Sequence, residues 1–500
     1  MKKHLYFLFF SFISISIISC SNDDSSDNTN TNSDTDTPTS VINTNDPNFD
    51  LSVDPGINPV FLNDPELNQT EDYTYVETSP GDHNLPDGII PIAYDVSGVN
   101  NLQTTLSNSL ADLENGHGLA LYLKNGNELN DQDLSFLQRL NLNENGWPGL
   151  DNLNTLHVYN LLRLQPGIES TTETAFGIPE PFLWKNGWQG PESIVLQGEG
   201  GWVDHIVMDD LEEISAGAFC DTNFSSMSFK GAKIVRQMGL GFAPRAPATI
   251  LYMPSVEMVE QHAFRRRQRI LKYNFPKLKE VGSFAFDDNS RMQYINLPSL
   301  ETTDIRNSFN DPRDLIAFNF PKVEYLGLSC MGGTNDTTTI FRFPAMLNFD
   351  GSSLRGHSNM EFIWAPEATR IGPNVFIGNS SLTTVYMPKV EDVGRFAFQD
   401  CTSLVSLELQ SATIIRINAF DGATALEEVR LPSIQEIQNE VFLNVSSLER
   451  VYLGDTPPEQ GTNAFTGTSP NLTIFYTGNN PEWETWRPVG NETAQVIREE

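Results

Sequence analysis

Apolar side chains return at fixed positions along most of the second half of the chain. Between Leu382 and Phe398 they follow the order Leu, Val, Met, Val, Val, Ala and Phe, and the same order then begins again. A large apolar residue closes each unit, and these anchor positions are Phe219, Phe242, Phe264, Phe286, Phe309, Met331, Leu354, Phe376, Phe398, Phe420, Phe442 and Phe465. Successive anchors are 22 or 23 residues apart. A ladder of prolines runs in the same phase, at Pro254, Pro276, Pro298, Pro321, Pro344, Pro366, Pro388 and Pro432.

A period of this length with spaced aliphatic residues is the signature of a leucine-rich-repeat solenoid, in which each coil buries its apolar side against the next. We therefore predict a mainly β solenoid with short turns or helices and about 12 coils of 22–23 residues. The alternation before each proline predicts a short strand with one buried face, which the proline ends because it lacks a backbone donor. Residues 390–394 predict a second short strand or turn, with Gly394 allowing the bend.

The repeat resembles that of BspA-like leucine-rich-repeat surface lipoproteins of the Bacteroidetes type. In that family an Ala-Phe pair is followed by polar residues, a cysteine and a Leu-rich strand ending in proline, and residues 397–409 match this order closely. The resemblance covers residues 203–476, and it includes the final coil with Phe465, Tyr476 and Trp483. It implies a leucine-rich-repeat fold on a bacterial surface protein that functions in adhesion.

The remaining composition divides the chain into five parts. We predict a lipoprotein signal peptide at 1–19, a disordered acidic tether at 20–85, an α/β cap or degenerate repeat domain at 86–200, the repeat array at 201–476 and a C-terminal cap or tail at 477–500. The tether is rich in Asp, Asn, Ser, Thr and Pro and buries too little apolar surface to offset the entropy of ordering. The cap is expected because the first coil of a solenoid must be covered.

The N-terminus has the layout of an export signal. Lys2 and Lys3 precede an apolar run over residues 5–18, which is too short for a comfortable membrane span and ends at Cys20. It resembles a bacterial lipoprotein signal, which implies that Cys20 is lipidated and anchors the chain to the outer membrane, exposed at the cell surface. The alternative is an uncleaved anchor with an incidental cysteine.

The other cysteines, Cys220, Cys330 and Cys401, lie five and three repeats apart. At ~4.8 Å per stacked strand, these separations are roughly 24 and 14 Å. A disulfide requires Cα atoms within about 7 Å, so we predict three free, mostly buried thiols.

Charge and motif content argue against several classes of function. The net charge is −34, and a nucleic-acid ligand would require a basic field, so we expect none. The sequence contains no His-Glu-x-x-His, Cys-x-x-Cys, Gly-x-Ser-x-Gly or phosphate-binding loop. We therefore predict no catalytic residues, no metal site, no cofactor and no enzyme activity, with calcium on an Asp-rich loop left open.

One candidate binding surface follows from the register of the predicted strands. Residues two and four before each proline point away from the core, and stacked coils arrange them in columns. This register predicts an exposed aromatic patch of Phe362, Trp364 and Tyr386 beside Arg342. Aromatic and Arg side chains are common anchors for protein ligands, and aromatic rings also suit sugars. The alternative is that these rings pack on a flanking domain or stabilise the sheet.

A second candidate surface is a basic segment. Residues 230–279 contain 11 Lys and Arg against two Glu, and Arg265, Arg266, Arg267 and Arg269 follow directly after the Phe264 anchor. The planar guanidinium fork suits sulfate, phosphate or carboxylate, so an anionic polymer or acidic protein is a possible ligand. The alternatives are a solvated loop and a docking place for the chain's own acidic tether.

These observations favour a non-enzymatic, adhesin-like surface protein that recognises an extracellular protein or glycan through the exposed face of the solenoid. Two other functions stay open: a carbohydrate-capture accessory of a polysaccharide uptake system and an envelope scaffolding protein. A solenoid fixes the shape of its surface and not the residues on it, so the fold alone does not select the ligand.

Overall fold

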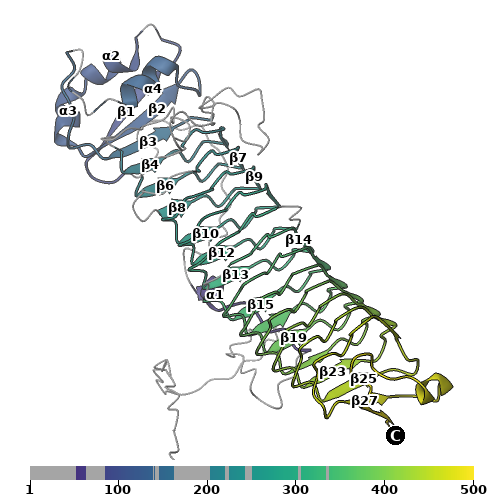
Figure 1. Ribbon diagram of the computed structural model, residues 1–500. Coiled ribbons are helices and arrows are strands. Elements are labelled where there is room, and N and C mark those ends of the chain that lie inside the picture. Colours follow the sequence, from purple (N-terminus) through teal and green to yellow (C-terminus); the bar gives the residue numbers. More distant parts are fainter. Residues whose placement is uncertain are drawn as a thin grey trace, which may run out of the picture. The chain divides into compact units, whose positions relative to one another are not determined.

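The computed structural model describes residues 52–63, 85–162, 203–219, 224–241, 250–301, 306–333 and 337–499, with short gaps at 99, 139, 141–142 and 144–145. The predicted signal segment, Cys20, Cys220 and Phe242 lie outside these residues. Within the unit formed by Val41–Glu500, the repeats make a stack of parallel coils, as the sequence period predicts (Figure 1).

The longer strands of the coils lie side by side along one flank of the solenoid, which we call the strand face. They are β4 (His205–Val207), β6 (Ser226–Ser228), β8 (Ile250–Tyr252), β10 (Lys272–Asn274), β12 (Tyr294–Asn296), β13 (Ala317–Asn319), β15 (Ile340–Arg342), β17 (Phe362–Trp364), β19 (Thr384–Tyr386), β21 (Ser406–Glu408), β23 (Glu428–Leu431), β25 (Arg450–Leu453) and β27 (Thr473–Tyr476). These strands form four parallel sheets in succession, which end at β8, β13, β19 and β28 (Gln495–Arg498). Within the third sheet, β15 pairs with β17 and β17 with β19.

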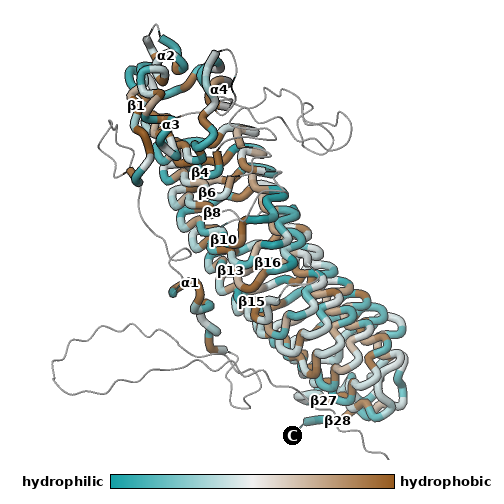
Figure 2. The backbone as a smooth tube through the Cα atoms, turned by 90° about the vertical axis from the view of Figure 1, so that its left-hand side faces the viewer, coloured by the Kyte–Doolittle hydropathy of each residue, from teal (hydrophilic) through white to brown (hydrophobic). Residues whose placement is uncertain are grey.

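A second row of short parallel strands comes from the piece after each proline. It contains β5 (Glu213–Ile214), β7 (Ile234–Val235), β9 (Met258–Val259), β11 (Glu280–Val281), β14 (Tyr325–Leu326), β16 (Asn348–Phe349), β18 (Arg370–Ile371), β20 (Asp392–Val393), β22 (Ile414–Ile415), β24 (Glu436–Ile437) and β26 (Glu459–Gln460). The second strand expected within residues 390–394 is thus confirmed as β20. The core lies between the two rows, and hydrophobic residues recur from coil to coil along the tube (Figure 2).

The segment before the repeats joins the same sheet. Strands β1 (Ile89–Asp95), β2 (Gly118–Lys124) and β3 (Thr155–Tyr159) run parallel, and β3 pairs with β4 of the first repeat. Three helices accompany these strands: α2 (Leu102–Ser107), α3 (Leu110–Asn115) and α4 (Asp131–Gln138). This part therefore extends the solenoid core.

The anchor side chains form a continuous stack through that core. Phe398 and Phe420 are parallel within 4°, with ring centroids 5.3 Å apart, and Phe420 and Phe442 follow at 5.4 Å. Met331 and Leu354 replace aromatic anchors and are equally buried. Removing one such side chain would leave a cavity with no neighbour to fill it.

One predicted anchor is wrong. The Phe219 amide donates to Gly239 O at 2.8 Å, and the next link runs from Leu240 N to Ala263 O at 2.9 Å, so Leu240 and not Phe242 takes the anchor position. Leu240 is fully buried. The regular 22- or 23-residue step concealed this shift because both residues are large and apolar.

Gly394 is required for a different reason from the one predicted. A Cβ at this position would lie 2.4 Å from the Gly372 carbonyl carbon and oxygen of the preceding coil, so the close approach of two backbones demands glycine. The left-handed bend lies two residues later, at Phe396 with φ 57°. The same position carries positive φ values at Phe284, Asn374 and Glu440.

The last coil is closed by tryptophans. Strand β28 (Gln495–Arg498) pairs with β27, and the 3-10 helix η2 (Pro481–Glu484) precedes it. Trp483 is 2% exposed, stacks on Tyr476 with centroids 4.5 Å apart, and donates from Nε1 to Asp455 O at 2.7 Å. Trp486 donates similarly to Pro458 O at 3.0 Å. These contacts cover the terminal apolar face as a solenoid cap must.

Cys330 and Cys401 are free and fully buried, which confirms the prediction for these two cysteines. Burial raises the pKa of the Cys330 thiol to about 12. Both therefore act as small core residues and not as reactive thiols. Across the described ranges, no helix has the length and apolar character of a membrane span.

Candidate functional site

The strand face carries the side-chain columns that the register predicts. Ile340 lies opposite Phe362, and Phe362 opposite Thr384, while Arg342, Trp364 and Tyr386 form the neighbouring column. The column that contains Arg342 also contains an amide ladder in earlier coils. There, Asn296 Nδ2 donates to Asn274 Oδ1 at 2.9 Å and Asn319 Nδ2 donates to Asn296 Oδ1 at 2.8 Å.

Arg342, Trp364 and Tyr386 form the Arg342 cluster. The guanidinium carbon of Arg342 lies 5.8 Å from the centroid of the Trp364 ring. Trp364 and Tyr386 are stacked, with centroids 6.3 Å apart and planes inclined by 14°. An arginine on an aromatic face has its fork held in one orientation, which favours a planar anionic partner such as a carboxylate. The structure thus brings together three of the residues predicted for this patch.

The predicted exposure of this patch is wrong. Phe362 is fully buried and Trp364 is only 5% exposed, although both project from the strand face away from the main core. Tyr386 is half-buried. Strand register predicts the direction of a side chain and not what covers it, so the sequence could not reveal this burial.

The carboxylate beside Arg342 comes from the segment Ser52–Asn63, which we call the strap. Nε and Nη2 of Arg342 donate to Oδ1 and Oδ2 of Asp54 in a bidentate pair. Burial by itself raises the pKa of Asp54, but the hydrogen bonds from Arg342 and from the Gly56 amide outweigh it, so the pKa lies below its usual range. Asp54 is therefore ionised at neutral pH.

A second strap contact is apolar. Helix α1 (Val60–Asn63) presents Phe61, which is 3% exposed and packs on Ala317 of β13, with Tyr294 of β12 beside it. The contacts of the strap with the strand face thus include a carboxylate, a ring and the partly buried Val60. Helix α1 lies beside β13 and β15 in both views (Figures 1 and 2).

Sequence reasoning placed Asp54 and Phe61 in a disordered tether, and the structure differs. Asn58 accepts from the Val60 amide at 3.1 Å, and Pro59 starts the helical turn, which is a typical helix start. The Asn-Pro pair before Val60, Phe61 and Leu62 was the signal that could have identified an ordered segment.

A comparable cluster lies further along the same face. The guanidinium carbon of Arg430 is 3.7 Å from the Tyr452 ring centroid, and Tyr452 stacks on Phe475 at 4.8 Å. We call these three residues the Arg430 cluster. Its carboxylate comes from the same strand, because Glu428 accepts from Arg430 Nε at 2.8 Å and from Arg450 Nε at 2.9 Å.

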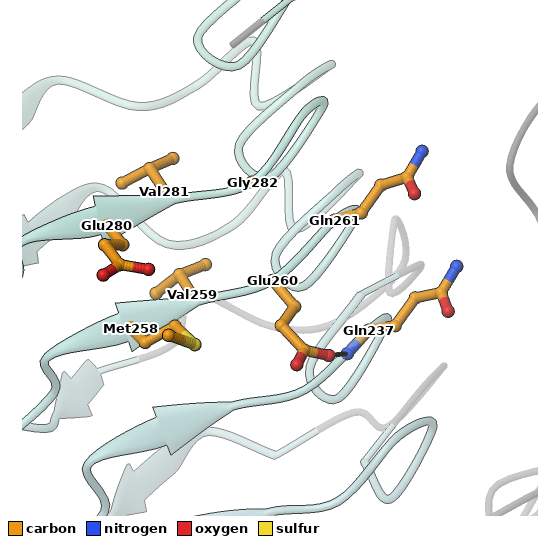
Figure 3. A pocket seen from close by; sticks show the side chains of 8 residues that line it. All are labelled: Gln237, Met258, Val259, Glu260, Gln261, Glu280, Val281 and Gly282. Carbon is orange, nitrogen blue, oxygen red and sulfur yellow. Dashed lines mark hydrogen bonds between the residues drawn. The ribbon is translucent and has the colours of Figure 1, made fainter. Parts of the chain in front are cut away.

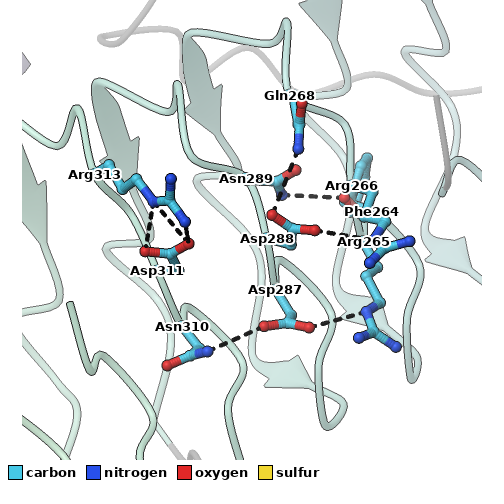
Figure 4. Close-up of polar contacts among 10 residues, drawn as sticks. All are labelled: Phe264, Arg265, Arg266, Gln268, Asp287, Asp288, Asn289, Asn310, Asp311 and Arg313. Atoms are coloured by element: carbon cyan, nitrogen blue, oxygen red, sulfur yellow. Dashed lines mark hydrogen bonds and ion pairs between the residues drawn. The ribbon is translucent and has the colours of Figure 1, made fainter. Parts of the chain in front are cut away.

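The predicted basic surface is largely occupied by internal contacts (Figure 4). Arg265 and Arg266 form ion pairs of 2.9 Å with Asp287 and Asp288 of the next coil. Arg267 is 1% exposed, and its Nη2 donates to Phe219 O at 2.9 Å. Arg269 is the exposed arginine of this loop. Adjacent coils therefore satisfy charges that look available in the sequence.

The same coil buries a histidine. His262 is 1% exposed and stacks on Phe284, with ring centroids 5.2 Å apart. Burial, assisted by the charge of Arg265, lowers the pKa of His262 to about 3. This histidine is therefore neutral near pH 7, and its surroundings give it a structural role.

The row of short strands carries a shallow pocket (Figure 3). It is lined by Gln237, Met258, Val259, Glu260, Gln261, Glu280, Val281 and Gly282. The Glu260 carboxylate accepts from the Gln237 amide at 2.9 Å and from Arg236 Nη1 at 2.7 Å. These contacts join adjacent coils.

No metal site emerges from the part of the chain that the structure describes, because no three or more His, Cys, Asp or Glu side chains gather there as ion ligands.

Several solved leucine-rich repeat proteins are similar to this chain. A leucine-rich repeat protein from Bacteroides ovatus is 20% identical, with a TM-score of 0.43, over 65% of this chain and 91% of that chain. A leucine rich cell surface protein from Faecalibacterium prausnitzii is 13% identical, with a TM-score of 0.32, over 76% of this chain and 82% of that chain. The pneumococcal vaccine antigen PcpA is 12% identical, with a TM-score of 0.33, over 70% of this chain and 80% of that chain. None of these values identifies a ligand.

Among curated proteins, none matches this sequence. The family model described as the BspA type leucine rich repeat region, in six copies, matches residues 246–361 and 352–473. The resemblance of the repeats inferred from residues 397–409 is thereby confirmed, and residues 246–473 carry leucine-rich repeats of the BspA type.

Proposed function

We propose that this protein is a non-enzymatic binding protein of the cell surface, which recognises an extracellular protein or polymer through its strand face at the Arg342 cluster. The observation that carries the proposal is that Arg342, stacked on Trp364, pairs with a carboxylate from a distant segment, Asp54, and not with one from its own coil. Trp, Tyr and Arg are the residues most enriched among binding hot spots.

The location is part of the same proposal. A lipid on Cys20 would hold the chain in the outer membrane, and the acidic residues that follow would keep the solenoid away from the lipid surface. Metabolic labelling with a fatty-acid probe tests this point. The wild type should be labelled and Cys20→Ala should not, and equal labelling of both would reject lipidation.

The parallel Trp364 and Tyr386 rings also support a second candidate, carbohydrate capture for a polysaccharide uptake system, because stacked rings provide a platform for sugars. A protein ligand is favoured by Arg342, whose bidentate fork already holds a carboxylate in this structure. A scaffolding role within the envelope would require no external ligand.

One screen separates these functions. The full chain, purified in mild detergent, is tested against extracellular matrix proteins and a glycan array. We expect a protein ligand whose binding is lost in Trp364→Ala/Tyr386→Ala and kept in the matched control Arg430→Ala/Tyr452→Ala. Glycan binding with the same dependence would favour carbohydrate capture.

A third variant tests the basic loop through Arg265→Ser, Arg266→Ser and Arg269→Ser, leaving the buried Arg267 in place. Binding lost only in this variant would move the site to the loop. If every hit bound all variants equally, the proposed strand-face site would be rejected. If no hit appeared at all, scaffolding would become the better account.

A further inference from the structure

The strap lies on the same face as the proposed binding site. Asp54 reaches Arg342 in β15, and Phe61, seven residues later, covers Ala317 in β13. The Gly56 amide donates to Asp54 Oδ1 at 2.8 Å, and Gly56 has φ 80°, so the chain turns directly after the carboxylate. The segment thus reaches from β15 to β13, with the carboxylate contact near its start and the aromatic contact near its end.

The strap is held by side chains. None of the sheets of the described chain includes a strand from residues 52–63. Recognition therefore depends on the Arg342 fork for the carboxylate and on the Ala317–Tyr294 surface for the ring. Two such contacts at a fixed spacing can select a peptide, because each disfavours a segment that lacks the matching side chain.

The Arg342 cluster depends on this outside carboxylate. Ile340, Trp364 and Tyr386, its neighbours on the strand face, carry no acid, and the carboxylate paired with Arg342 lies 288 residues away in sequence. The arginine of the Arg430 cluster instead pairs with Glu428, only two residues away. An arginine that takes its carboxylate from a distant segment can exchange that segment for another of similar chemistry.

We propose that the strand face from β12 to β17 is a peptide-binding surface and that the strap is a built-in competitor for its ligand. The ligand is a partner peptide that carries a carboxylate and an aromatic side chain about seven residues apart, as the strap does. This proposal rests on the proposed function, since it names the ligand class and the regulation of the same site. A partner binds by displacing residues 52–63.

A labelled synthetic peptide of residues 51–64 provides the probe. Its binding to the full chain, in mild detergent, is measured by fluorescence anisotropy, with a scrambled peptide as control. In wild type the strap competes from the same chain at high effective concentration, so binding should be weak. In Asp54→Asn/Phe61→Ala, binding should be about tenfold tighter or more.

Two further variants in that strap-released background locate the binding. Adding Arg342→Ala should weaken peptide binding about tenfold or more, because the bidentate carboxylate pair is lost. Adding Arg430→Ala, the matched arginine on the same face, should leave affinity within about twofold. Circular dichroism melts confirm that all variants are folded.

The proposal is overturned if wild type and the strap-released variant bind the peptide equally, if the scrambled peptide binds as well, or if Arg342→Ala has no effect. These results are distinguishable from failure of the proposed function. Only the proposed function would be rejected if the peptide bound at Arg342 but the natural ligand bound Trp364→Ala/Tyr386→Ala as well as wild type. A natural ligand that needs those rings, combined with no peptide competition, would reject only this inference.

Discussion

The two arginine–aromatic clusters of the strand face differ in the origin of their carboxylate. In the Arg430 cluster, Glu428 and Arg430 belong to one strand, so the ion pair forms with the coil itself. In the Arg342 cluster, Asp54 belongs to the strap, and the pair forms only when a separate segment docks. The arginine side chain is 40% exposed in the first case and 18% exposed in the second.

The difference separates structural contacts from binding contacts on a single repeated surface. A cluster that satisfies its own charge has little free energy to gain from a ligand, because an added carboxylate would compete with one already in place. In a cluster whose arginine pairs with a distant segment, a competing partner can replace that segment and form the same ion pair. The origin of the carboxylate, and not the stacked rings, therefore distinguishes the candidate site.

The largest expected effect is a loss of stability when a side chain is removed from the core beneath both clusters. Phe398 lies between Phe376 and Phe420, with centroids 5.2 and 5.3 Å away. Phe398→Ala should lower the free energy of unfolding by ~3 to 5 kcal/mol, because a buried ring leaves a cavity. Chemical denaturation measures this loss.

The matched control is Val405→Ala. Val405 is 47% exposed, so the change should stay within about 0.5 kcal/mol. A Phe398→Ala variant of normal stability that lost ligand binding alone would contradict the separation of core from face.

The next effect is on ligand binding. Trp364→Ala removes the ring beneath Arg342 and should lower affinity for the ligand found by the screen about tenfold, as for a hot-spot residue. Tyr452→Ala removes the equivalent ring beneath Arg430 and should change affinity less than about twofold. Titration calorimetry of both variants measures the difference, and equal losses would remove the distinction between the clusters.

A smaller effect is expected from pH. The Arg342 hydrogen bonds, acting against burial, hold the pKa of docked Asp54 below its usual value. Because the docked carboxyl has a lowered pKa, its ionisation stabilises docking at pH values above the ordinary pKa of Asp. This stabilisation is lost as the pH falls through the pKa of docked Asp54. Binding of the 51–64 peptide to the strap-released variant should be constant from pH 7 to about 5 and decline in stronger acid. The same peptide with Asn at position 54 should show a weaker dependence, and identical pH profiles would argue against the ion pair.

The smallest effect should sharpen the comparison by converting one cluster toward the other. Glu428→Gln removes the internal carboxylate and leaves Arg430 and Arg450 without this partner. In the Asp54→Asn/Phe61→Ala/Arg342→Ala background, it should increase binding of the acidic peptide about threefold, since an exposed pair contributes little. Fluorescence anisotropy measures the gain. If the affinity for the peptide did not change, removal of the internal carboxylate would be insufficient to create a binding site.

Most of the fold was predictable because the repeat constrains it at every coil. The period identified the solenoid, its two rows of strands and the outward columns, which the pairing of β15, β17 and β19 confirms. The prediction of the anchors was wrong in one coil, where two nearby residues both have the large apolar side chain that the anchor position requires. Leu240 and Phe242 are both large and apolar, and the backbone hydrogen bonds decide between them.

The site was predictable only in part. The sequence identified Arg342, Trp364 and Tyr386, because register is a local property. It did not predict that Phe362 and Trp364 are buried, that Arg267 points into the protein, or that Asp54 pairs with Arg342. These are contacts between segments or between coils, and no periodicity within one repeat encodes them.

Hydrogen exchange at the strap tests the central claim most directly. Mass spectrometry of peptides covering residues 52–63 compares wild type, Arg342→Ala and Arg430→Ala as full chains. The Phe61 amide donates to Asn58 O at 3.0 Å and should be protected while the strap is docked. We expect protection in wild type and Arg430→Ala and its loss in Arg342→Ala. Equal exchange in all three proteins would contradict the claim that Arg342 holds this segment.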